Sequence, residues 1–110
     1  MPDILLFGAT GFTGRLTAKA LARRGADFAI AGRSRTKLEA LSELIGSPAV
    51  HVAHVGDTAS LVRALRGSRV LVTCVGPFVE LGMTAASAAM ESGVHYIDST
   101  GEQAFVGRLI

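Results

Sequence analysis

The chain has 110 residues, of which 49% are hydrophobic, 5% aromatic and 18% charged, and its formal net charge is +2. This length suits one domain whose core is filled by aliphatic residues and alanine. The basic residues are scattered instead of forming a stripe, so we expect no nucleic-acid partner. The single cysteine excludes an internal disulfide, and no apolar run approaches the roughly 20 residues of a membrane span. We therefore expect a cytoplasmic protein.

Short apolar runs alternate along the chain with amphipathic segments. In chain order they predict a strand at 3–7, a helix at 12–24, a strand at 27–31, a helix at 36–45, a strand at 49–55, a helix at 58–66, a strand at 70–75, a helix at 81–91, a strand at 95–99 and a helix over 102–110. This alternation is typical of βαβ units with right-handed crossovers. The predicted fold class is therefore α/β: a Rossmann-like, doubly wound parallel sheet with strand order 3-2-1-4-5.

Three of the predicted helices carry signals at their ends. Gly25 follows the first helix as a C-terminal cap, and Asp57 precedes the third helix as an N-cap. Thr36 and Glu39 have the spacing of a capping box. The second helix is therefore predicted to begin at Thr36.

The helical pattern over 102–110 stops with no cap and no terminal Gly or Pro. A five-stranded sheet of this type also lacks the usual sixth strand. We therefore expect a chain truncated before that strand. On this interpretation residues 1–110 are one NAD(P)-binding Rossmann domain, and a C-terminal substrate domain is absent.

The first predicted strand leads directly into the run Gly8-Ala9-Thr10-Gly11-Phe12-Thr13-Gly14. In a dinucleotide-binding turn Gly8 allows the sharp turn, Gly11 lets the backbone approach the pyrophosphate, and Gly14 lets the helix pack closely. The free N–H groups of the helix N-terminus would bind the phosphates. A glycine turn without a ligand is the alternative interpretation. The position of the run between a strand and a helix favours the dinucleotide.

The end of the second predicted strand indicates which dinucleotide binds. An NAD-binding domain usually places an acid there for the ribose hydroxyls, but this chain has none between Asp27 and Glu39. It has Arg33, which can pair with a 2′-phosphate and stack on adenine, and Ser34, which can donate a hydrogen bond. A solvated basic turn is the alternative. The predicted cofactor is NADP(H), with NAD less favoured.

Two further loops are expected at the same edge of the sheet. Asp57, after the third strand, is either a plain helix cap or a contact to adenine, or both. Val75, Gly76 and Pro77 follow the fourth strand, where they should touch the ribose on the nicotinamide side. Cys74 has apolar neighbours and no basic partner nearby in the sequence, so it is interpreted as a packing residue and not a nucleophile.

Catalytic residues are not assigned. Asp98 and Glu102, at the end of the fifth strand, could act as a general acid or base, but structural hydrogen bonding is the alternative. The Tyr-x-x-x-Lys pair of short-chain dehydrogenases is absent, because Tyr96 is followed by Thr100 at that spacing. The three histidines and the cysteine show no metal-ligand spacing, so no metal site is predicted.

Four motifs together resemble the N-terminal NADP-binding domain of saccharopine dehydrogenase-like oxidoreductases. They are Gly8-Ala9-Thr10-Gly11-Phe12-Thr13-Gly14, Ala31-Gly32-Arg33-Ser34, Val75-Gly76-Pro77-Phe78 and His95-Tyr96-Ile97-Asp98-Ser99-Thr100-Gly101-Glu102. The last two motifs together are far more specific than the glycines alone. Within this group the chain is most similar to the bacterial branch that includes trans-acting enoyl reductases of lipid biosynthesis.

The resemblance implies that Gly11 to Thr13 hold the pyrophosphate, Arg33 and Ser34 the 2′-phosphate, and Val75 to Pro77 the nicotinamide side. It also implies a second domain that shapes the pocket for a small-molecule or lipid-like substrate and often carries dimer contacts, so a homo-oligomer is possible. The residues predicted to bind the cofactor are Gly8, Thr10, Gly11, Phe12, Thr13, Gly14, Arg33, Ser34, Asp57, Val75, Gly76 and Pro77.

Two classes of function follow from these predictions. The first is the cofactor domain of an NADP-dependent oxidoreductase, which transfers hydride between nicotinamide and a C=N or C=C substrate held by the second domain. The second is a non-catalytic module that senses NADP(H) or serves as a scaffold. The 110-residue chain alone is expected to be inactive in either case.

Overall fold

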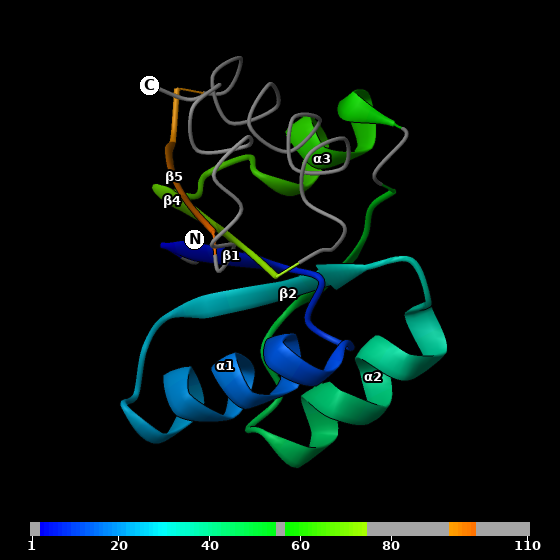
Figure 1. Cartoon of the computed structure of the whole chain (residues 1–110), viewed down its shortest axis with the longest axis vertical. Helices are drawn as coiled ribbons and strands as arrows, with labels where there is room; N and C mark the ends of the chain where they lie inside the picture. Colours follow the sequence, from blue (N-terminus) through cyan, green and yellow to red (C-terminus); the bar gives the residue numbers. More distant parts are fainter. Residues whose placement is uncertain (1–2, 55–56, 75–92, 99–110) are drawn as a thin grey trace.

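The computed structural model describes residues 3–54, 57–74 and 93–98. Its elements are β1 (Ile4–Phe7), α1 (Phe12–Arg23), β2 (Phe28–Gly32), α2 (Arg35–Leu44), β3 (Val50–Val52), α3 (Thr58–Ala64), β4 (Val70–Thr73) and β5 (His95–Asp98). The strands form a sheet with the order β3-β2-β1-β4-β5 (Figure 1). The helices predicted at 81–91 and 102–110 lie outside the described residues.

Strand β1 lies in the middle of the sheet, between β2 and β4. Ile4 is in register with Phe28 of β2 on one side and with Val70 of β4 on the other, and both pairings are parallel. The chain therefore moves outward from β1 to β3 and then returns to the other side of β1. This confirms the predicted parallel α/β sheet and its order through the first four strands, and β5 pairs with β4 in parallel.

Alternate side chains of β1 enter two different hydrophobic clusters, because successive residues of a strand point to opposite faces. Leu5 and Phe7 pack in a cluster with residues of α3, whereas Leu6 packs with residues of α1 and α2. Figure 1 shows the corresponding layers, with α1 and α2 on one face of the sheet and α3 on the other. All five residues of β2 are buried, as expected for an inner parallel strand.

Helix α2 begins earlier than the capping box predicts. Ser34 is its N-cap: the residue is extended, and its Oγ accepts a hydrogen bond from the N–H of Lys37 at 3.3 Å. Thr36 already lies inside the helix, so the predicted start at Thr36 is wrong. The physical reason is that the turn after Gly32 is short, so Ser34 comes into the N-cap position before Thr36.

The other two predicted helix ends are confirmed. Gly25 has a φ of 68°, a left-handed conformation that glycine adopts without strain at the end of a helix. Asp57 precedes α3, and its side chain accepts a hydrogen bond from the N–H of Ser60. None of the helices that the structure describes has both the length and the apolar character required to cross a bilayer.

Candidate functional site: the edge beyond β1 and β2

The loop after β1 is tied to the end of β2. Gly8 has a φ of 81°, so the predicted need for glycine at this turn is confirmed. The N–H groups of Gly8 and Ala9 both donate to the carbonyl oxygen of Ala31, at 3.0 and 3.3 Å. The loop therefore sits at the carboxyl edge of the sheet, beside the turn that carries Arg33.

Helix α1 presents unsatisfied N–H groups at this edge. Gly11 is the N-cap and offers no side-chain cap, and the first turn contains no acidic residue. The N–H of Arg15 donates to Gly11, but the described residues supply no acceptor for the N–H groups of Phe12, Thr13 and Gly14. The helix dipole adds partial positive charge at the same place, so the site is suited to bind an anion.

Two glycines of the loop have different steric surroundings. A Cβ on Gly14 would meet the carbonyl oxygen of Gly8 and lie 2.8 Å from its carbon and 2.9 Å from the Cα of Ala9. The predicted close approach at Gly14 is thus confirmed. Among the described residues, a Cβ on Gly11 would contact only the carbonyl oxygen of Gly8, at 3.7 Å. The surroundings of Gly11 are therefore open enough for the predicted approach of a pyrophosphate, and the contact itself stays a prediction.

The turn between β2 and α2 carries the charge that the sequence predicts. Arg33 is exposed, and it has no ion-pair partner among the described residues. Arg35 differs, since its guanidinium lies 3.7 Å from the carboxylate of Glu39. Ser34 uses its oxygen as a helix cap, so its hydroxyl proton remains available to a ligand. Within the described part of the chain, no carboxylate therefore competes with a ligand for Arg33.

Asp57 is confirmed as a helix cap and sits in a small hydrogen-bond network. Its carboxylate accepts from the N–H of Ser60 at 3.2 Å, and its carbonyl accepts from the Ser60 hydroxyl at 2.8 Å. Ser60 in turn accepts from the N–H of His54 at 3.0 Å. The Asp57 residue is exposed. Contact with adenine stays a prediction.

Cys74 continues the pairing of β4 with β1 by one residue. Its N–H donates to the carbonyl of Phe7 at 2.9 Å, which places Cys74 beside the start of the glycine loop. Its sulfur lies 3.8 Å from the Thr17 hydroxyl, and the residue packs against the cluster that contains Leu6. Its predicted packing role is confirmed. Val75, Gly76 and Pro77 lie outside the described residues.

Asp98 is the last residue of β5 and is in register with Thr73 of β4. Both strands run parallel to β1, so Asp98 ends at the edge that carries the glycine loop. Glu102 lies outside the described residues. A catalytic role for either carboxylate stays a prediction.

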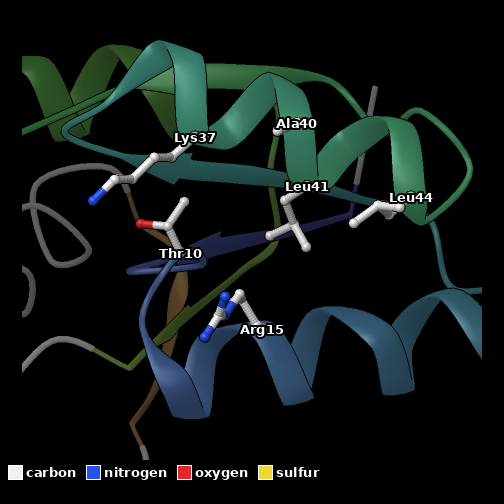
Figure 2. Close-up of a pocket in the computed structure, with 6 residues that line it drawn as sticks. All are labelled: Thr10, Arg15, Lys37, Ala40, Leu41 and Leu44. Carbon is white, nitrogen blue, oxygen red and sulfur yellow. The ribbon is translucent and has the colours of Figure 1, made fainter.

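The structure also shows a cleft of about 440 Å³ between α1 and α2, which was not predicted from the sequence. Figure 2 shows the Thr10 hydroxyl, the Lys37 side chain and the Arg15 guanidinium around this cleft. Only Thr10 was among the predicted site residues. The sequence did contain a signal for this cleft. Two successive right-handed crossovers put α1 and α2 on the same face of the sheet, and the first turns of both helices carry cations.

A family model described as the saccharopine dehydrogenase NADP binding domain matches residues 4–105. A protein of Mycobacterium tuberculosis strain H37Rv, named as a provisional trans-acting enoyl reductase, is 41% identical over 110 residues, or 94% of this chain and 26% of the relative. The trans-acting enoyl reductase of Mycobacterium ulcerans is 38% identical over 109 residues, with the same coverage of both chains. The chain thus spans about a quarter of the length of the curated relatives it matches.

Solved structures share the fold. Saccharopine dehydrogenase of Saccharomyces cerevisiae superposes with a TM-score of 0.79 at 19% identity, over 97% of this chain and 24% of that one. An NADPH-dependent quinone oxidoreductase of Escherichia coli superposes with a TM-score of 0.70 at 27% identity, over 86% of this chain and 33% of that one.

Proposed function

We propose, from the premise that this chain belongs to the saccharopine dehydrogenase NADP-binding domain family, that it binds NADP(H) in preference to NAD(H) at the edge beyond β1 and β2. The pyrophosphate lies on the free N–H groups of Phe12 and Thr13, next to Gly11. The 2′-phosphate lies at the turn after β2, where Arg33 and the Ser34 hydroxyl donate to it.

The observation that carries this proposal is the difference between Arg33 and Arg35. Arg35 is within ion-pair distance of Glu39, whereas Arg33 is exposed and unpaired within the described part of the chain. Helix α2 also has no acidic residue in its first turn. A cation at a helix N-terminus opposes the helix dipole, so a bound anion would stabilise this arrangement. The 2′-phosphate supplies such an anion with roughly two negative charges.

For the whole protein we propose an NADP-dependent oxidoreductase. The bound nicotinamide supplies or accepts a hydride, and the substrate carries a C=N or C=C bond. The relatives named as trans-acting enoyl reductases support the C=C alternative. Because those relatives are about four times as long as the matched region, we place the substrate-binding part outside residues 1–110. This chain contributes the binding and orientation of the cofactor.

Calorimetric titration of the 110-residue chain with NADP⁺ and NAD⁺ tests the cofactor preference. We expect Arg33→Ala to weaken NADP⁺ binding by about tenfold to a hundredfold, since charge-assisted hydrogen bonds are lost. NAD⁺ binding should change much less. Arg24→Ala is the control, because Arg24 is exposed at the opposite end of α1.

Two results would contradict the proposal. Equal affinity of the unmodified chain for NADP⁺ and NAD⁺ would remove the assignment of the 2′-phosphate site. Equal losses for both cofactors in Arg33→Ala would show that Arg33 only stacks on adenine. Raising the salt concentration should also reduce the preference for NADP⁺, because part of it comes from screened charge.

A further inference from the structure

The cleft between α1 and α2 has a polar end and an apolar floor. Three polar residues, Thr10, Arg15 and Lys37, line it together with Ala40, Leu41 and Leu44. Figure 2 shows Thr10 and Lys37 at one end of the cleft, with Arg15 reaching into it from α1. That end is bounded by the glycine loop and the first turn of α2.

The charges around the cleft are unbalanced. None of its six lining residues is acidic. Arg15 and Lys37 are both exposed, and neither forms an ion pair with any residue that the structure describes. Two cations from different helices therefore line one cleft, and no carboxylate of the described ranges pairs with either of them. Like charges repel, and an anion bound between them would offset this repulsion because it attracts both cations.

The backbone connects this end of the cleft to the proposed 2′-phosphate site. The helix cap fixes the backbone at Lys37, since the backbone N–H of Lys37 donates to the Ser34 hydroxyl oxygen at 3.3 Å. Thr10 lies within the glycine loop, whose first residues bond to the end of β2. The cleft therefore opens between the two segments that hold the pyrophosphate and the 2′-phosphate in the proposed function.

We propose that Arg15 and Lys37 form the inner wall of the 2′-phosphate site and share with Arg33 the discrimination between NADP(H) and NAD(H). Arg33 approaches the phosphate from the turn after β2. Lys37 and Arg15 approach it from the cleft side, and the Thr10 hydroxyl donates beside them. This inference rests on the proposed cofactor. It adds specificity-determining residues from the first turns of α1 and α2.

The test is calorimetric titration of Arg15→Gln and Lys37→Gln with adenosine 2′,5′-bisphosphate, NADP⁺, adenosine 5′-monophosphate and NAD⁺. We expect each variant to bind the two ligands that carry a 2′-phosphate about three- to tenfold more weakly. The two ligands without it should change by less than about twofold, since no anion then reaches the cleft. Arg63→Gln is the matched control, because Arg63 is an exposed cation on α3, on the other face of the sheet.

The outcomes separate this inference from the cofactor assignment. If the unmodified chain prefers NADP⁺ and Arg33→Ala removes that preference, but Arg15→Gln and Lys37→Gln behave like Arg63→Gln, the cleft inference is overturned and the proposed function stands. If both variants weaken NAD⁺ as much as NADP⁺, the two cations act on the pyrophosphate and the inference is again overturned. Equal affinity of the unmodified chain for both cofactors overturns both proposals.

A double substitution strengthens the test. If Arg15 and Lys37 bind the same phosphate, their effects should not add, because neighbours that share a partner are coupled. Additive losses would place them on different groups and contradict the shared site. Lys37→Arg retains the charge and should keep most of the NADP⁺ affinity. Thermal unfolding of each variant shows that the fold is intact, as expected for exposed helix positions.

Discussion

Gly14 and Gly11 differ in why the glycine loop needs them. Gly14 is needed for the packing of α1 against the loop, whereas Gly11 is proposed to leave room for the ligand. Gly14 is the third residue of α1, where alanine usually stabilises a helix by about 0.5–1 kcal/mol relative to glycine. Here a Cβ would lie 2.8 Å from the carbon of Gly8 and 2.9 Å from the Cα of Ala9. Both are backbone atoms, so neither can turn aside as a side chain would.

We therefore expect Gly14→Ala to destabilise the chain by about 1–3 kcal/mol, through backbone shifts in a tightly packed place. The measurement is chemical unfolding followed by circular dichroism. The sign of the change in unfolding free energy separates the two effects, since helix propensity alone would make Gly14→Ala slightly stabilising. An unchanged or raised unfolding midpoint would show that the loop moves away from α1 at little cost.

Gly11→Ala is expected to behave in the opposite way. Gly11 has a φ of −74°, which alanine also adopts, and its Cβ would make only an ordinary contact of 3.7 Å. The fold should keep its stability within about 0.5 kcal/mol. The methyl group would nevertheless occupy the space proposed for the pyrophosphate, so NADP⁺ and NAD⁺ should both bind more weakly by calorimetry. Unchanged affinity for both would place the pyrophosphate elsewhere.

At the scale of elements, the two candidate caps of α2 make a direct comparison possible. Ser34 accepts the hydrogen bond from the N–H of Lys37, whereas Thr36 lies inside the helix and is exposed. Ser34→Ala should lower the stability of the ligand-free chain by about 1 kcal/mol, the usual effect of losing a side-chain cap. Thr36→Ala should leave it unchanged or raise it slightly, because alanine is the better helix former. If Thr36→Ala lowered the melting temperature more than Ser34→Ala, Thr36 and not Ser34 would be the cap.

The strands that the structure describes were well predicted from the sequence, because short apolar runs ending in glycine are clear signals for parallel strands. The helices predicted at 81–91 and 102–110 stay predictions. The turns were harder to predict. The spacing of Thr36 and Glu39 satisfies a local rule, but the true start of α2 depends on where β2 ends, at Gly32. That position is decided by sheet pairing and not by the residues of the turn.

The candidate site was predicted as far as it depends on backbone motifs. The glycine loop and Arg33 are adjacent to strands, so topology alone brings them together at one edge. Arg15 and Lys37 could not be singled out in this way. Their relation depends on how two helices lie side by side, and a helical cation is in most proteins simply a solvated residue.

At the scale of the whole molecule, we expect the 110-residue chain to bind NADPH without oxidising it. Hydride transfer requires a substrate held against the nicotinamide, and the proposed substrate-binding part lies outside this chain. The check is NADPH absorbance during incubation of the purified chain with enoyl and imine substrates. Steady NADPH oxidation above the rate without protein would contradict the proposal that the substrate-binding part lies outside this chain. A protein of the relatives' length that binds NADPH and also shows no turnover would favour the sensor or scaffold alternative.

The central place of β1 has a consequence for synthesis on the ribosome. β1 precedes the other described strands of this sheet, so its pairing with β2 can form early, but its other edge pairs with β4, which begins only at Val70. Until then the nascent chain carries an apolar strand with one row of unpaired N–H and C=O groups. Such an edge invites pairing with another chain. Until β4 has emerged, this edge of β1 is therefore open to pairing with another chain.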